Sequence, residues 1–352
     1  MCDFKKLKKI LFRIDPETAH HMTEMAVRFA QTMPFFLPLL KRRYSVSGDS
    51  LTQTIFGRQF PNPVGLSAGF DKNATMIRGM SALGFGFVEV GTVTPLAQEG
   101  NPRPRLFRFP EYESLQNAMG FNNDGMESVL KRMERAFPSS VPVGVNIGKN
   151  KATPQGEAIK DYQTLINAFK DLCDYLVINI SSPNTPQLRD LQNERFIADL
   201  FKTARQMTSR PIFLKIAPDM DKAAAVSLCS TAVEHGASGI IAANTSTDYS
   251  LLPGAREFGG ISGKVIREKN FAIFDSIACE LYGKTILISV GGIDSGKEAY
   301  RRFKAGASLV QIYSAMIFQG PALVGKINKE LLELMERDGV KNITDIIGIE
   351  RR

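Results

Sequence analysis

The sequence has few of the residues that hold secreted or metal-binding proteins together. The 352 residues include four cysteines, which lie far apart without the paired spacing of a zinc or redox site: Cys2, Cys173, Cys229 and Cys279. We interpret them as buried or incidental thiols in a reducing compartment. The charged start of the chain also lacks the apolar core of a signal peptide. No secretion signal, disulfide framework or metal site is therefore expected.

Long apolar runs and low-complexity tracts are also missing. No window of the sequence approaches the roughly 18 apolar residues that a transmembrane helix needs. With 43% hydrophobic and 23% charged residues, the composition is typical of a globular protein with a sizeable core. We expect the protein to be made and kept in the cytoplasm.

Positive charge is in excess, with a formal net charge of +8. Such an excess attracts nucleic acids, acidic membrane surfaces or anionic ligands without specifying any of them. The densest basic clusters lie at 5–13 and 41–43, and no RNA-binding or zinc-finger pattern accompanies them. We therefore predict no nucleic-acid partner.

Short apolar runs recur along the chain, bounded by Gly, Pro or Asn and separated by room for one helix each. Nearly continuous apolar character is typical of strands that helices cover on one face and a packed interior covers on the other. The eight predicted strands are 63–68, 87–93, 141–147, 175–180, 211–217, 239–245, 285–291 and 308–314.

Alternating strands and helices imply parallel pairing through right-handed crossovers. Eight such units favour an α/β fold of the closed (β/α)8 TIM barrel type over an open sheet, which stays possible. Barrels of this kind take about 250 residues, which leaves room for one short appendage. The polar and glycine residues gather at the C-terminal ends of the strands, where barrel enzymes place their chemistry, and this favours an enzyme.

Three features suggest a site for a phosphate and a planar ring. Glycines at Gly291 and Gly292, before a helix, present backbone N–H groups to an anion. A second group lies at 259–263, before the helix after the sixth strand. Lys215 stands in an otherwise apolar strand, where an unpaired ammonium is costly. It could form a Schiff base, hold a phosphate or place positive charge beside a ring.

The segment from Asn179 to Asn184 carries two serines between two asparagines, with Pro183 stiffening the turn. These groups can hydrogen-bond a polar planar substrate at several edges while a hydroxyl faces it. A capped loop before the next helix is an equally good interpretation of the spacing. No histidine is placed to serve a serine triad, because the nearest candidates lie in the N-terminal stretch and at a helix end.

Several long motifs resemble one known family. They are NISSPNT from Asn179, GFNNDG from Gly120, NIGKNK from Asn146, KIAPD from Lys215, SVGGIDS from Ser289 and GASLVQIYSA from Gly306. Together they resemble the dihydroorotate dehydrogenases, in their membrane-associated, quinone-using class. The resemblance runs in order from about Asp15 to Gly320, nearly the whole chain.

The resemblance implies an FMN enzyme that oxidises dihydroorotate to orotate in pyrimidine synthesis and passes the electrons to a quinone. In that family the base after the fourth strand is serine in the quinone-linked class and cysteine in the soluble class. Carried over to this chain, Ser182 removes the C5 proton, while Thr185 and Phe121 shape its exit. Lys215 stabilises negative charge on reduced flavin.

The resemblance also implies two sets of binding residues. Dihydroorotate and orotate would contact Lys72, Asn117, Ala118, Met119, Gly120, Phe121, Asn179, Asn184, Asn244 and Thr245. FMN would contact Ala68, Gly69, Lys72, Thr92, Asn146, Asn179, Lys215, Ala243, Gly263, Gly292, Tyr313 and Ser314. Two positions depart from the family: Ala243 stands where threonine is common, and Ser289 where glycine is frequent. At Ala243 the resemblance therefore implies a flavin contact through the backbone alone.

We predict an N-terminal helical extension at 1–45 and an FMN-binding barrel domain at 46–352. The extension is expected to form helices at 4–13 and 16–31, followed by an apolar stretch at 34–40 and a basic cluster. Apolar residues beside Lys and Arg suit an element that lies on an anionic bilayer without crossing it, here the cytoplasmic face of the inner membrane. A helical lid or an oligomer contact is the alternative. By resemblance, the quinone site is lined by His20, Arg108 and Tyr313.

Three other functions stay open from the residues alone. One is a soluble dehydrogenase of dihydroorotate or a dihydropyrimidine, which would use fumarate or a nicotinamide cofactor. Ser182 and the N-terminal helices count against it. Another is a phosphate-binding lyase or isomerase with Lys215 as a Schiff-base lysine. The last is a noncatalytic membrane-surface module, which the polar strand ends disfavour.

Overall fold

Eight parallel strands close into a barrel in this computed structural model, which describes residues 4–46 and 48–352. The predicted Cys2 thiol lies outside the described residues. All eight predicted strands are confirmed. The strand at 87–93 has the predicted bounds, and the other seven are shorter at one or both ends. They are β3 (Val64–Leu66), β4 (Phe87–Val93), β7 (Val143–Ile147), β8 (Tyr175–Asn179), β9 (Ile212–Lys215), β10 (Gly239–Ala242), β12 (Ile286–Val290) and β13 (Leu309–Ile312).

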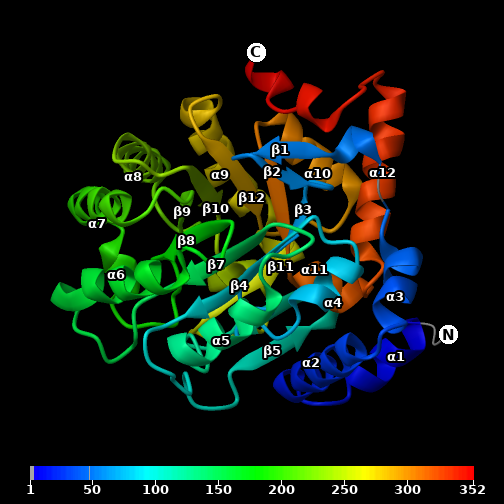
Figure 1. The fold of residues 1–352 in the computed structure, drawn as a ribbon, viewed down its shortest axis with the longest axis horizontal. Helices are drawn as coiled ribbons and strands as arrows, with labels where there is room; N and C mark the ends of the chain where they lie inside the picture. Colours follow the sequence, from blue (N-terminus) through cyan, green and yellow to red (C-terminus); the bar gives the residue numbers. More distant parts are fainter. Residues whose placement is uncertain (1–3, 47) are drawn as a thin grey trace.

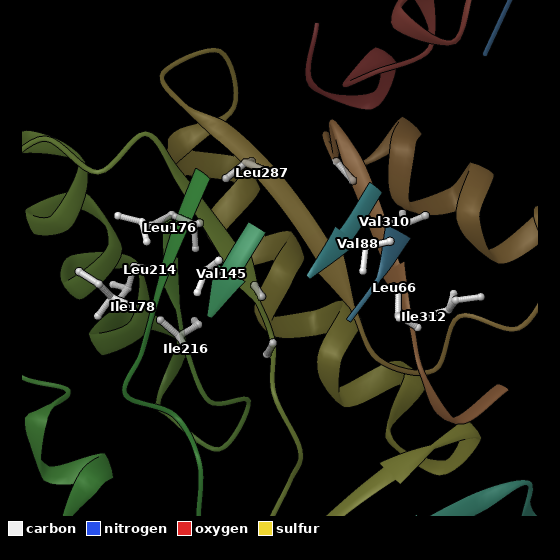
Figure 2. Close-up of a cluster of buried hydrophobic side chains, with 14 of the residues drawn as sticks. Leu66, Val88, Val145, Leu176, Ile178, Leu214, Ile216, Leu287, Val310 and Ile312 are labelled. Carbon is white, nitrogen blue, oxygen red and sulfur yellow. The ribbon is translucent and has the colours of Figure 1, made fainter. Parts of the chain in front are cut away.

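Each barrel strand buries both faces because successive side chains alternate between the interior and the helices. Figure 2 shows Leu176, Ile178 and Leu214 from adjacent strands, members of the cluster between strands and helices. The alternate residues, such as Phe87 and Phe213, form a separate cluster with the hairpin of β1 (Gln53–Ile55) and β2 (Arg58–Phe60). The N-terminal end of the barrel is thus packed shut, and only its other end is left for a site.

Helices surround the barrel, as Figure 1 shows. Several begin at side-chain caps: Asp221 accepts from the N–H groups of Ala223 and Ala224, and Ser295 accepts from that of Glu298. The helices that follow the barrel strands are α4 (Ile77–Ala82), α5 (Met126–Ala136), α6 (Ala158–Phe169), α7 (Glu194–Met207), α8 (Lys222–Glu234), α9 (Arg267–Leu281), α10 (Gly296–Lys304), α11 (Ser314–Gln319) and α12 (Leu323–Arg337).

A small antiparallel sheet, which the sequence did not predict, forms from loops after two barrel strands. It joins β5 (Leu106–Phe109), β6 (Ser114–Asn117) and β11 (Gly260–Gly263). The glycine group at 259–263, which the sequence places before a helix, is therefore mostly strand. Packing requires glycine at position 260, because a Cβ there would lie 2.1 Å from the Thr245 hydroxyl oxygen.

The N-terminal extension forms three helices, not the predicted two: α1 (Phe4–Leu11), α2 (Pro16–Thr32) and α3 (Phe36–Tyr44). The third takes in most of the apolar stretch and the basic cluster that were expected to follow the helices. Large apolar side chains stay exposed on this extension, Phe35 at 86% and Phe29 at 63%. No helix in the described part of the chain has the length and apolar character to cross a membrane.

Candidate active site

A cavity of about 560 Å³ opens at the C-terminal end of the barrel strands and extends toward α2. The structure brings most of the predicted site residues to its wall: Ala68, Gly69, Lys72, Thr92, Asn117, Met119, Gly120, Phe121, Asn179, Ser182, Asn184, Lys215, Ala243, Asn244, Thr245, Gly263, Gly292, Tyr313, Ser314 and His20. Four predicted residues lie outside the lining, namely Ala118, Asn146, Thr185 and Arg108.

The serine proposed as a base lies just beyond the end of β8. Ser182 is buried, and its Oγ accepts a hydrogen bond from the Asn184 N–H at 3.2 Å. Among the described residues, no histidine or carboxylate hydrogen-bonds to this oxygen. The Thr185 hydroxyl is buried nearby in sequence without any hydrogen-bond partner. A buried hydroxyl without a partner is costly, and such groups often mark a functional requirement.

Amide and hydroxyl groups run in one hydrogen-bonded series across the barrel mouth. Asn179 donates to Thr92 Oγ1 and to Asn146 Oδ1, both at 3.0 Å. Its own Oδ1 accepts from the Ser181 hydroxyl at 3.0 Å, and Ser181 accepts from Asn244 Nδ2 at 2.9 Å. Asn146 thus supports the wall from beneath rather than lining it. The series fixes which amide edges face the cavity.

A second pair of amides closes the side of the cavity. Asn184 Nδ2 donates to Asn117 Oδ1 at 3.0 Å and to the Asn117 carbonyl at 3.2 Å. The segment after Asn117 turns sharply, with φ of +71° at Gly120 and +54° at Phe121. A non-glycine residue in this left-handed region is uncommon, and its strain is often found at functional sites.

A buried ion pair occupies the interior just below the cavity floor. Lys215 Nζ lies 3.3 Å from Glu89 Oε1, with side chains only 4% and 0% exposed. Glu89 also accepts from Asn146 at 2.8 Å and from Gln311 at 2.5 Å, so each of its two oxygens has a hydrogen-bond partner. These bonds offset part of the cost of burying two charges. Lys215 donates further to Ser67 Oγ at 3.2 Å and still lines the cavity.

The side of the cavity toward α2 carries the Lys72 ammonium and a series of aromatic rings. Burial lowers the pKa of Lys72 to about 8, although the nearby Glu17 carboxylate opposes the shift. Burial, and then the Lys72 charge, lowers the pKa of His20 to about 3, so this imidazole is neutral at physiological pH. The His20 ring packs edge-on against Phe70, and Phe70 packs against Tyr313. The rings link α2 to the barrel mouth.

Arg108 is a predicted site residue that lies outside the cavity wall. It lines a separate, open groove and donates to the carbonyls of Leu11 and Ile14, while its guanidinium lies over the Phe12 ring at 4.7 Å. Leu106 is a wall residue of both the groove and the cavity. Arg108 therefore fastens the α1–α2 connection, and the structure does not bring it together with His20.

The end of the cavity near β12 and β13 is lined by small and polar residues. Gly292 and Gly263 have φ of +74° and +107°, and the hydroxyls of Ser262 and Ser314 lie 2.9 Å apart. Ala243 lines the cavity with no polar side-chain atom, as its departure from the family implied. Ser289 instead points toward α10, where its hydroxyl accepts from the buried Arg302 at 3.3 Å. That variation is explained by packing and leaves the cavity unchanged.

Sequence reasoning missed several residues that hold the site together. Glu89 stands in the apolar strand FVEVGTV, so the argument that singled out Lys215 could have found it as well. Ser181 was read only as part of a polar segment, although it bridges two site asparagines. Arg189, which donates to the carbonyls of Ser181 and Thr245, carried no signal in the sequence.

Comparisons with known proteins all point to the same family. The family model described as dihydroorotate dehydrogenase matches residues 50–335. The chain is 59% identical to a "Dihydroorotate dehydrogenase (quinone)" of Nitratiruptor, over 99% of this chain and 100% of that protein. It is 57% identical to a protein of the same name from Sulfurimonas denitrificans, over 100% of both chains. A solved structure of Eimeria tenella DHODH in complex with ferulenol is similar with a TM-score of 0.87 and 33% identity, over 96% of each chain.

Proposed function

The chain belongs to the dihydroorotate dehydrogenase family, and we propose that its cavity binds dihydroorotate against a flavin with Ser182 as the base. It is a quinone-dependent dihydroorotate dehydrogenase of pyrimidine synthesis. The observation that carries the assignment of roles is the position of Ser182, buried at the mouth of the barrel between two pairs of hydrogen-bonded asparagines.

The residues of the cavity fit FMN. Alanine and glycine at 68–69 leave room for a planar ring, and Gly263, Gly292 and Ser314 suit a phosphate at the end of β12 and β13. Lys215 places a cation at the cavity floor, with Glu89 behind it. When bound, FMN supplies the acceptor for the hydride that leaves C6 of dihydroorotate.

The substrate is a ring with alternating donors and acceptors and a carboxylate, and it becomes planar on oxidation to orotate. Asn117, Asn184 and Asn244 present amide groups to such a ring, and Lys72 offers the carboxylate a cation. The hydrogen bonds among the asparagines fix their orientation before the substrate arrives. Such preorganisation lowers the entropy that binding must spend.

Proton removal falls to Ser182. Its Oγ takes the C5 proton as the hydroxyl gives up its own proton, and the Asn184 N–H that already donates to this oxygen holds it in position. A serine hydroxyl is a weak base, so the proton needs a path onward. The unpartnered hydroxyl of Thr185 can accept and pass on that proton, and the strained Phe121 shapes the path beside the loop.

The quinone meets the cavity on the side of the N-terminal extension. His20 and Tyr313 line this side, and Phe70 packs between their rings. Arg108 acts on the same side by holding the α1–α2 connection through its backbone acceptors. Because His20 stays neutral, it can donate or accept a hydrogen bond to a quinone oxygen without carrying charge.

We place residues 1–45 on a membrane surface, peripheral and on the cytoplasmic face, with the remaining chain as the catalytic domain. Support comes from exposed apolar residues on α2 and α3, such as Phe29, Phe35 and Leu39, next to the basic Lys41–Arg43 cluster. An amphipathic surface of this kind binds a bilayer that contains anionic lipids without crossing it.

One experiment tests the assignment. The purified FMN-loaded protein is mixed with dihydroorotate in the absence of oxygen, and the visible absorption of the flavin is followed. We expect bleaching with the unmodified protein and at least ~100-fold slower bleaching with Ser182→Ala, the usual loss for a general base. Absence of bleaching in the unmodified protein would reject the substrate; an equal rate in Ser182→Ala would reject the base.

A further inference from the structure

The most extensive polar contact between the N-terminal extension and the barrel lies at Glu17 of α2. Its carboxylate receives Arg105 Nη2 at 2.6 Å and Arg105 Nε at 3.1 Å, a two-pronged pair, and Arg103 Nη2 at 3.0 Å. The Arg105 side chain is 6% exposed and that of Glu17 is 15% exposed. Bidentate pairs of this kind, largely shielded from water, fix geometry as well as contributing energy.

Arg105 uses its remaining terminal nitrogen on the loop before it. Nη1 donates to the Glu99 carbonyl at 2.5 Å and to the Asn101 carbonyl at 2.8 Å. The Arg105 carbonyl accepts the Ala118 N–H at 2.8 Å. One residue therefore joins α2, the loop at 99–101 and the segment that begins at Asn117.

Asn101 continues the contact to the substrate residues. Its Nδ2 donates to the carbonyls of Ala118 at 3.0 Å and Asn184 at 3.1 Å, and its N–H donates to the Met119 carbonyl at 3.1 Å. It also packs so closely that a Cβ on Gly120 would lie 2.8 Å from its side-chain carbon. Asn101 thus contacts both of the segments that carry the hydrogen-bonded amides, one at Asn117 and the other at Asn184.

We propose that Arg105 and Asn101 are positioning residues for dihydroorotate, and that Glu17 makes their position depend on the docking of α2. The proposal rests on the function proposed above, because it takes Asn117 and Asn184 as substrate contacts. The helix α2, which lies on the quinone side of the cavity, then also affects the affinity for dihydroorotate. Coupling between two sites through one chain of contacts typically changes affinity by 5–150-fold.

The test measures the dissociation constant of orotate by titrating the flavin spectrum of the full-length, FMN-loaded enzyme at pH 6, where the Lys72 ammonium is retained. We expect Glu17→Gln to raise this constant about tenfold. Arg105→Lys keeps the charge beside Glu17 but cannot reach the two carbonyls, so it should raise the constant by a similar factor. Flavin content and Tm, measured in parallel, report whether each variant is folded.

Gln31→Leu is the matched control. Gln31 also fastens α2 to the barrel, through Thr75 and Gly79, and within residues 4–46 and 48–352 its side-chain hydrogen bonds do not lead to Asn101. Its loss should lower Tm while the orotate constant stays within twofold. An equal rise in Gln31→Leu, or no rise in Glu17→Gln and Arg105→Lys, would overturn the proposal.

A double-variant cycle separates the chain of contacts from simple charge effects. If Glu17 acts through Asn101, the double variant Glu17→Gln/Asn101→Ala binds orotate no more weakly than Asn101→Ala alone. If the increases in the orotate dissociation constant of the two single variants multiply in the double variant, Glu17 acts by another route and the proposal is overturned. Failure of the unmodified enzyme to bind orotate would instead reject the function on which the proposal rests.

Discussion

Lys215 Nζ and Glu89 Oε1 lie 3.3 Å apart in the interior of the barrel, away from water and directly below the cavity. Neither charge can be removed alone without leaving the other buried and uncompensated. Breaking such a pair typically costs 3–5 kcal/mol, whereas replacing both partners by neutral residues costs far less. The pair therefore ties the stability of the barrel to the charge that faces the cofactor.

Glu89→Gln should lower the free energy of unfolding of the flavin-free protein by about 3–5 kcal/mol, because it leaves Lys215 unpaired. The double variant Glu89→Gln/Lys215→Met should recover most of that loss. Thermal and denaturant unfolding measure both values. In the FMN-loaded enzyme, Glu89→Gln should also raise the flavin reduction potential, since the Lys215 cation is no longer offset. A double variant as unstable as the single one would contradict this account.

The Thr185 hydroxyl has no hydrogen-bond partner although it is buried. Thr185→Val keeps the shape and removes only this group, so we expect the protein to gain about 1 kcal/mol of stability. If the hydroxyl passes the proton onward from Ser182, flavin reduction by dihydroorotate should nevertheless slow at least ~10-fold. Stopped-flow absorption and thermal unfolding give the two readouts.

Thr92→Val is the control for Thr185→Val, because it removes a hydroxyl that does have hydrogen-bond partners. The Thr92 hydroxyl donates to Asn146 at 2.6 Å and accepts from Asn179, so its loss leaves buried partners unsatisfied. Stability should fall by about 1–3 kcal/mol. A Thr185→Val enzyme that reduces its flavin at the normal rate would remove Thr185 from the proton path.

The barrel was predictable because strand runs and helical periodicity are local properties, and the eight strands closed as expected. Residues at the strand ends, such as Asn179 and Lys215, were predictable because parallel strands bring their C-terminal ends together. Glu17, Arg105 and Asn101 were not, because their contacts join segments about 80 residues apart and depend on side-chain geometry. The helix α3 was missed for a local reason, because Pro38 lies within it and proline is rare inside helices.

Arg189 joins the base segment to the sixth barrel strand. It donates to the Ser181 carbonyl at 3.0 Å, to the Thr245 carbonyl at 2.9 Å and to Asp219 at 2.9 Å. Lysine cannot reproduce this fork, so Arg189→Lys should weaken orotate binding about tenfold, the loss of roughly one charged hydrogen bond. Spectral titration of the flavin with orotate measures it.

Arg205→Lys serves as its control. Arg205 makes a similar fork, to the carbonyls of Gly236 and Arg210 and to Ser238, but at the N-terminal end of the barrel. It should cost stability while the orotate affinity stays unchanged. Equal losses of affinity in the two variants would mean that Arg189 acts through general stability.

The exposed apolar residues of α2 and α3 should decide attachment to membranes. Phe35→Ser combined with Leu39→Ser removes two side chains that are 86% and 57% exposed. We expect the bound fraction on vesicles with anionic lipids to fall at least ~10-fold in sedimentation assays, because each exposed apolar side chain is worth about 1.5–3 kcal/mol when buried. Phe56→Ser, an exposed residue at the opposite end of the barrel, should leave binding unchanged.

The last prediction concerns pH and follows from the pKa of Lys72, which burial lowers to about 8. As pH rises through this value the ammonium loses its proton, so the cation that attracts the dihydroorotate carboxylate disappears. We therefore expect kcat/KM for dihydroorotate to fall above about pH 8, approaching tenfold per pH unit, while the quinone KM stays level. The charged groups that act on Lys72 are Glu17, Arg105, Glu24 and Asp71, and the Lys72 charge acts in turn on His20.

Lys72→Arg distinguishes this group from its neighbours. A guanidinium keeps its charge over the whole range, so the variant should bind more weakly at pH 7 but lose the fall above pH 8. His20 cannot produce the same profile, because burial and the Lys72 charge hold its pKa near 3 and leave it neutral throughout. If Lys72→Arg retains the fall above pH 8, the titrating group is another one, and Lys72 is not the residue that reads the substrate carboxylate.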